Sequence, residues 1–133
     1  AGLMIVDGEP FLIEYNVRMG DPECQTILPR LENDLMEVIE AVINCKLDSL
    51  NLSWQNSKSL CIVLCSKGYP EKFQNEVEIK NLEKLEEKKN DEEFIFHAGT
   101  KIINKKIFSN GGRVLNFVKQ SKDFKKSRDE LII

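Results

Sequence analysis

The sequence has no long hydrophobic run and no excess of the residues that mark fibrous or disordered chains. Its longest apolar stretches, such as 60–65, have the length of a strand, well short of the roughly 18 to 20 residues that a membrane-spanning helix needs. The chain has 133 residues, of which 41% are hydrophobic and 31% charged. This composition is typical of a soluble globular protein, and we expect no membrane partner.

Cysteine and histidine motifs for metal binding are also missing. The 4 cysteines, at positions 24, 45, 61 and 65, form no Cys-x-x-Cys pair, and the single histidine, His97, cannot supply a zinc motif. We therefore interpret the cysteines as reduced thiols, which predicts a cytoplasmic protein, and expect Cys61 and Cys65 to be buried. An isolated histidine at the end of a strand-like run is more often a hydrogen-bonded structural residue than a catalyst.

Charge is distributed unevenly along the chain, although the net charge is only -3. Residues 1–57 include 10 acidic and 3 basic residues, whereas residues 58–133 include 12 acidic and 16 basic ones. Together with a polar connection over 46–58, this difference predicts two modules, 1–57 and 58–133. The chain opens on a strand-like segment without an initiator methionine and ends on the apolar residues 131–133, so we expect a fragment of a longer protein.

The first module is predicted to begin with a β-hairpin and to continue with two helices. Asp7-Gly8 is a strong signal for a tight turn between the apolar runs 3–6 and 11–16. Asp21 as the cap and Pro22 as the first helical residue predict a short helix that ends near Leu28. A second helix is expected after Asp34, with a face that packs against a partner because apolar residues recur at helical spacing: Leu35, Val38, Ile39 and Val42.

The second module is predicted to be rich in strands. These strands are expected over 59–66, 77–80, 94–98, 101–108 and 113–119. We interpret the charged stretch 81–93 as a solvated helix or loop. Lysines are frequent over 119–128, but acidic residues lie among them and no aromatic platform accompanies them, so we expect no nucleic-acid partner.

One segment carries polar side chains that could form a site. Because side chains alternate between the faces of a strand, Glu14, Asn16 and Arg18 are expected on one face, opposite an apolar one. Residues two apart on a strand have Cα atoms about 6.5 Å apart. A carboxylate and an amide oxygen at this spacing can converge on one ion, and oxygen ligands suit Mg²⁺ or Mn²⁺ rather than Zn²⁺. Arg18 would supply a cationic fork for phosphate or carboxylate.

The same pattern is also typical of a strand with one solvent-exposed face, and such strands are common. The Gly-Asp-Pro-Glu turn over 20–23 would direct backbone N–H groups toward the polar face, an arrangement that attracts anions. A plain helix cap would have the same local sequence. The pattern alone therefore leaves both interpretations open.

Several motifs, in their order along the chain, resemble one enzyme family. The stretch 14–25, with the sequence EYNVRMGDPECQ, is similar to the signature of the phosphoribosylamine–glycine ligases, in the ATP-grasp superfamily. Further resemblances to this family lie at 28–31, 33–35, 68–70, 96–100 and 110–115. Met19 departs from the family pattern, which usually has Phe or Leu there, but an unbranched apolar side chain can fill a similar pocket.

The resemblance implies an α/β (α+β) fold, with the C-terminal part of an ATP-grasp domain over 1–57 and an incomplete, small, β-rich C-terminal domain over 58–133. It implies that the intact enzyme uses ATP to convert glycine to glycyl phosphate. The amine of 5-phosphoribosylamine then attacks this acyl phosphate to give glycinamide ribonucleotide, a step of purine biosynthesis.

The resemblance also implies roles for six residues. Glu14 and Asn16 match the positions that hold Mg²⁺ or Mn²⁺ on the ATP phosphates. Arg18 is expected as a catalytic residue that steadies phosphate or the acyl phosphate. The substrate site is expected to be shaped by the turn residues Asp21, Pro22 and Glu23.

The family's N-terminal substrate domain, glycine-rich phosphate loop and adenine pocket have no counterpart in this sequence. We therefore expect the chain alone to be inactive and its partner to be the missing N-terminal part of the same enzyme. The alternative is a non-catalytic binding or structural module derived from the tail of an ATP-grasp ligase. The presence of Glu14, Asn16 and Arg18 favours the ligase, because a module without ATP chemistry needs none of them.

Overall fold

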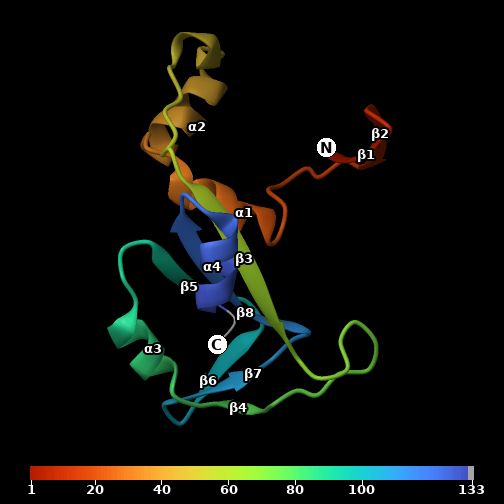
Figure 1. Cartoon of the computed structure of the whole chain (residues 1–133), viewed down its shortest axis with the longest axis vertical. Coiled ribbons are helices and arrows are strands. Elements are labelled where there is room, and N and C mark those ends of the chain that lie inside the picture. The colour runs from red at the N-terminus through yellow and green to blue at the C-terminus, as the bar shows by residue number, and fades with distance from the viewer. Residues whose placement is uncertain (132–133) are drawn as a thin grey trace.

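The computed structural model describes residues 1–131, whose strands form small antiparallel sheets next to short helices. Figure 1 shows the hairpin of β1 (Gly2–Val6) and β2 (Glu9–Glu14) and the helix α2 (Leu35–Ile43) projecting from a body of strands. The α/β fold class expected from the sequence is confirmed. Residues 132–133, which belong to the apolar end noted in the sequence, lie outside the described residues. Within the described part, no helix is long and apolar enough to cross a membrane.

The hairpin forms where Asp7-Gly8 predicted it. Asp7 has φ 51° and Gly8 has φ 86°, and positive φ at both central residues is the geometry that a tight two-residue hairpin turn requires. The second strand starts earlier than expected and already ends at Glu14. Every residue of β2 is exposed, so this hairpin has no apolar face covered by the described chain.

The helices of the first module are short. The predicted capping of the first helix is wrong, because Pro22 lies at the N-cap without a side-chain cap bond and α1 (Glu23–Ile27) begins at Glu23. A turn of 3-10 helix, η1 (Leu28–Arg30), continues it. In α2 the Asp34 carboxylate caps the helix, accepting a 2.7 Å hydrogen bond from Met36 N. Its apolar residues Leu35, Ile39 and Val42 are exposed. A second 3-10 turn, η2 (Leu47–Ser49), precedes the connection to the next strand.

The central sheet has the order β3-β8-β5 and holds the core. Its members are β3 (Lys58–Cys65), β5 (Glu93–His97) and the middle strand β8 (Arg113–Ser121), all antiparallel. Val114, Leu115 and Val118 of β8 are buried, together with Leu82. Both α1 and α4 (Phe124–Leu131) contact β3 and β8. This sheet therefore contacts helices from both halves of the sequence.

A second small sheet lies beside the first, in the order β4-β7-β6. It consists of β4 (Glu78–Ile79), β6 (Thr100–Ile103) and β7 (Lys106–Ser109). The single strand predicted over 101–108 is wrong, because Asn104 and Lys105, with φ of 50° and 64°, form a hairpin turn. The charged stretch 81–93, expected to be a helix or loop, contains the short helix α3 (Leu82–Lys88). Leu82 of this helix is buried in the core.

Candidate functional site

Glu14 and Asn16 lie together at the end of β2. Asn16 Nδ2 donates a 3.0 Å hydrogen bond to Glu14 Oε1. This bond fixes the orientation of the amide, so that Asn16 Oδ1 and Glu14 Oε2 are available as acceptors. The side chains of the two expected metal ligands are thus in direct contact, near the surface of the protein.

The donor set fits a hard divalent cation. A carboxylate and an amide oxygen are ligands that Mg²⁺ accepts, and Mg²⁺ usually keeps several waters and phosphate oxygens in place of a full set of protein ligands. Among residues 1–131 no group of three or more His, Cys, Asp and Glu side chains could hold a metal ion. Glu14 and Asn16 could therefore supply part of a coordination shell whose other oxygens come from elsewhere.

Among the described residues, Arg18 makes no hydrogen bond or ion pair with Glu14 or Asn16. Its Nη1 donates a 3.0 Å hydrogen bond to the neighbouring Met19 carbonyl, and the side chain is exposed. The alternation of a strand does not extend to Arg18, because β2 ends at Glu14. The strand face expected to carry all three residues therefore does not form, and Glu14 and Asn16 are held together by their hydrogen bond instead.

The turn at Asp21, Pro22 and Glu23 is held by local contacts. Asp21 Oδ1 accepts a 2.9 Å hydrogen bond from Gln25 Nε2 one turn further along. The Glu23 carboxylate lies close to Gly20, and any side chain at position 20 would collide with this carboxylate. A backbone hydrogen bond of 2.9 Å from Cys24 N to the Gly20 carbonyl closes the turn.

Arg113, at the start of β8, connects this turn to the second module. Its Nη1 donates a 2.6 Å hydrogen bond to the Asp21 carbonyl, and its Nη2 lies 3.3 Å from Asp21 Oδ2. Sequence reasoning did not assign Arg113 to the site, because 92 residues separate it from Asp21. The only available signal was its place in the motif 110–115, which carried the resemblance but no role.

Three motif segments of the second module converge around Arg113. Gly99 N donates to the Arg113 carbonyl at 2.8 Å, and Ser66 Oγ donates to the Gly111 carbonyl at 2.7 Å. A Cβ on Gly99 would lie 2.6 Å from the Arg113 carbonyl oxygen and 2.8 Å from Gly111 Cα, closer than packed atoms approach. A Cβ on Gly112 would likewise collide with the ring of Tyr69. These glycines allow the backbone segments to pack closely and so fix the position of Arg113.

His97 and Cys61 have environments that do not suit a catalytic base or nucleophile. His97 Nδ1 lies 2.9 Å from Thr100 Oγ1, as expected for a hydrogen-bonded structural residue. Burial, together with the nearby negative charge of Asp21, raises the pKa of the Cys61 thiol, which keeps it protonated. The expectation that Cys65 is buried is wrong, since the register shift after Leu64 leaves it exposed at the strand end.

Comparisons with known proteins agree with the sequence motifs. Residues 59–132 match the family model described as "Phosphoribosylglycinamide synthetase, C domain". Over 129 residues the chain is 41% identical to the phosphoribosylamine–glycine ligase of Caldanaerobacter subterraneus. This alignment covers 97% of this chain and 30% of that protein. Over 116 residues it is 46% identical to the trifunctional purine biosynthetic protein adenosine-3 of Gallus gallus, covering 86% of this chain and 11% of that protein.

A solved structure is similar as well. The crystal structure of phosphoribosylamine–glycine ligase from Thermotoga maritima matches with a TM-score of 0.61 and 29% sequence identity, over 96% of this chain and 30% of that one. The chain thus spans no more than 30% of the length of these three relatives.

Proposed function

The chain belongs to the phosphoribosylglycinamide synthetase family, and from this membership we propose that it is the C-terminal part of an ATP-dependent phosphoribosylamine–glycine ligase. In the proposed reaction ATP phosphorylates the glycine carboxylate, and the amine of 5-phosphoribosylamine displaces the phosphate. The products are glycinamide ribonucleotide, ADP and phosphate. The names of relatives that align with nearly the whole chain support this proposal. Residues 1–57 would complete an ATP-grasp domain, and 58–133 would form the C-terminal domain, in a cytoplasmic enzyme.

The hydrogen-bonded pair Glu14 and Asn16 is the observation that carries the proposal. Its two remaining oxygens would hold Mg²⁺ or Mn²⁺ against the phosphates of ATP. When bound, the cation neutralises phosphate charge and orients the transferred group. The Asn16 amide also restrains the Glu14 carboxylate, so that little side-chain freedom is lost on binding.

The remaining residues are proposed to act on the substrates. Arg18 is exposed, and within residues 1–131 its side chain is hydrogen-bonded only to the Met19 carbonyl. Its guanidinium can therefore turn to a phosphate or acyl-phosphate oxygen and stabilise the charge that develops there. The turn of Asp21, Pro22 and Glu23 would shape the glycine and phosphoribosylamine site. Arg113 would keep this turn in place by its two contacts with Asp21.

Replacement of Glu14 in the full-length ligase tests the metal assignment. We expect Glu14→Ala to lower kcat/KM by about 100-fold or more and to raise the Mg²⁺ concentration needed for half-maximal rate, because a direct ligand is lost. Glu92→Ala is the matched control, an exposed carboxylate outside the site, and should keep the rate within about twofold. The measurement is glycine-dependent phosphate release at varied Mg²⁺. Equal losses in both variants would remove Glu14 from the site.

The 133-residue chain alone should show no glycine-dependent ATP hydrolysis. Glu14 and Asn16 supply only two oxygens to a metal–ATP site, and the sequence has no counterpart of the family's glycine-rich phosphate loop or adenine pocket. Turnover by the purified chain would contradict its assignment as one part of the ligase and would favour a self-sufficient enzyme.

A further inference from the structure

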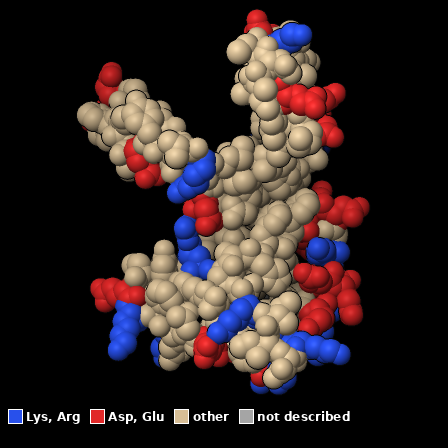
Figure 2. Space-filling view, turned by 180° about the vertical axis from the view of Figure 1, so that it is seen from behind, with Lys and Arg blue, Asp and Glu red and all other residues tan. Residues whose placement is uncertain are grey.

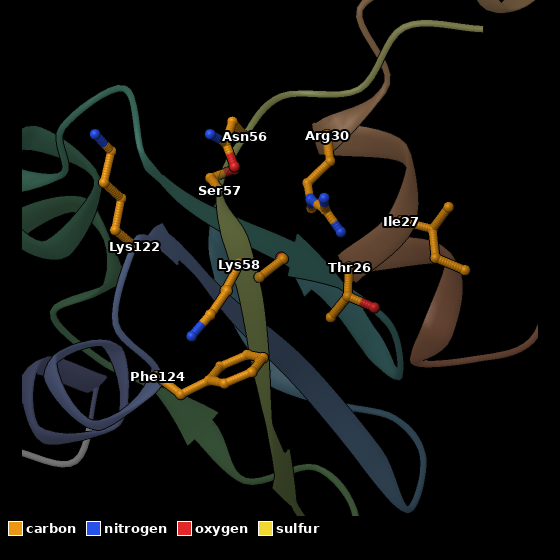
Figure 3. A pocket seen from close by; sticks show the side chains of 9 residues that line it. Thr26, Ile27, Arg30, Asn56, Ser57, Lys58, Lys122 and Phe124 are labelled. Carbon is orange, nitrogen blue, oxygen red and sulfur yellow. The ribbon is translucent and has the colours of Figure 1, made fainter.

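A cavity of about 550 Å³ lies between the C-terminal end of α1, η1, the start of β3 and the start of α4. Figure 3 shows Arg30 on the helical side of this cavity and Lys58 extending along β3 toward the ring of Phe124. Cavities of 300 to 1,000 Å³ are typical of small-molecule sites. The volume is therefore sufficient for a ligand larger than a single ion.

This cavity is separate from the Glu14 region. Lys58 and Ser59 line it and pair with Ser121 and Gln120, at one end of the β3–β8 ladder. Arg113, which holds the Asp21 turn, pairs with Cys65 at the opposite end of the same ladder. The two regions thus lie at different ends of the central sheet.

The cavity carries positive charge without a compensating carboxylate. Arg30, Lys58 and Lys122 line it, and no aspartate or glutamate does. Within residues 1–131, none of these three cations is within ion-pair distance of a carboxylate. The adjacent Asp123 does not line the cavity, and its Oδ1 accepts a 2.8 Å hydrogen bond from Lys125 N. The local field therefore favours an anion.

Polar atoms in the wall also lack partners. Ser57 Oγ, Ser59 Oγ and Arg30 Nε are buried, and none has a hydrogen-bond partner among the described residues. The guanidinium of Arg30 uses Nη2 to donate a 3.2 Å bond to the Gln55 carbonyl. Unpaired buried polar atoms are costly and rare in folded proteins. These three atoms have almost no accessible surface, so a ligand in the cavity would meet the ends of the cationic side chains instead.

We propose that this cavity binds the phosphate group of a small anion, either free phosphate or a phosphate monoester. Arg30 and Lys58 neutralise its charge. The guanidinium of Arg30, which lines the cavity, is a planar group of donors that suits phosphate. Lys58 lies 5.2 Å from the centroid of the Phe124 ring, an arrangement that restrains the ammonium at the cavity. The remaining volume beside Phe124 would hold the rest of a monoester.

A titration of the 133-residue chain with inorganic phosphate, at constant ionic strength and followed by amide chemical shifts, tests this site. We expect saturable shifts at Arg30 and over 56–59. Arg30→Gln and Lys58→Gln should each weaken binding by roughly tenfold, because each removes one charge-assisted contact. Lys84→Gln, an exposed lysine of α3, is the matched control and should leave the affinity unchanged.

Two further titrations distinguish the sources of the phosphate group. Tighter binding of ribose 5-phosphate than of inorganic phosphate would assign a monoester, and equal binding would assign free phosphate. Ribose itself should not bind. Shifts that do not saturate, or equal affinities in Lys58→Gln and Lys84→Gln, would overturn the proposal. Ligase activity is not part of the measurement, so this site and the proposed function can fail independently.

Discussion

Among single residues, Lys119 is the buried cation of the core. Its Nζ lies 2.5 Å from Glu93 Oε1 and 2.8 Å from Glu130 Oε2, and its side chain is 6% exposed. Burial lowers the pKa of Lys119, but the hydrogen bonds with Glu130 and Glu93 outweigh this effect and leave the pKa raised. The same contact lowers the pKa of Glu130. These ion pairs connect α4 and β5 to the central strand β8.

The lowered pKa of Glu130 predicts that the folded protein loses stability in acid. Because its pKa in the folded state is below its ordinary value of 4.5, its contribution is complete above pH 4.5 and is lost as pH falls through the lower folded pKa. Glu130→Gln should remove this part of the pH dependence, whereas Glu87→Gln, on the exposed face of α3, should retain it. Urea unfolding between pH 3 and pH 7 measures the difference. An unchanged slope in Glu130→Gln would contradict the assigned ion pair.

The candidate site was only partly predictable, because its residues meet over very different sequence separations. Glu14 and Asn16 are two residues apart, so strand alternation and the family resemblance both indicated them. The contact of Arg113 with Asp21 depends on how the second module packs against the first. No local pattern near either residue contains that information.

Among the elements, α2 contains more apolar residues than β8, yet its apolar side chains are the more exposed ones. Ile39 on α2 is 40% exposed, whereas Val118 in the middle of β8 is fully buried. We expect Val118→Ala to reduce the free energy of unfolding by about 2 to 3 kcal/mol, through lost burial and a cavity. Ile39→Ala should cost less than about 1 kcal/mol. Chemical denaturation of both variants checks this, and an equal cost would mean that α2 packs against a partner in solution.

Element prediction succeeded where the turn residues were distinctive. Asp7-Gly8 located the first hairpin, and Asp34 located the start of α2. The turn between β6 and β7 was missed because it consists of Asn104 and Lys105, without glycine or proline. A lysine rarely adopts positive φ, so the apolar run around it resembled one continuous strand.

The molecule as a whole exposes apolar surface on its two projecting parts. Leu3, Ile5, Phe11 and Ile13 of the hairpin are each more than half exposed. Figure 2 shows that the hairpin and α2 carry mostly uncharged surface. In the proposed full-length ligase these faces would be covered by the remainder of the ATP-grasp domain, because monomeric proteins rarely leave such patches in water.

This exposure predicts that backbone amides in different parts of the molecule are unequally protected from hydrogen exchange. An isolated two-stranded hairpin is marginally stable in water, so amides of β1 and β2 should exchange with solvent close to the rate of an unfolded chain. Amides of β8, hydrogen-bonded on both sides to β3 and β5, should exchange only on global unfolding. Hydrogen exchange of the 133-residue chain measures both. Strong protection of the hairpin would indicate self-association, and sedimentation velocity would detect it.

The order of strands in the central sheet also has a consequence during synthesis on the ribosome. The middle strand β8 follows both of its neighbours in the sequence. Until residues 113–121 have left the exit tunnel, β3 and β5 lack their common partner, and the nascent chain has no central sheet. Cotranslational folding of this part must therefore wait for β8, and both waiting strands are exposed to chaperones in the meantime.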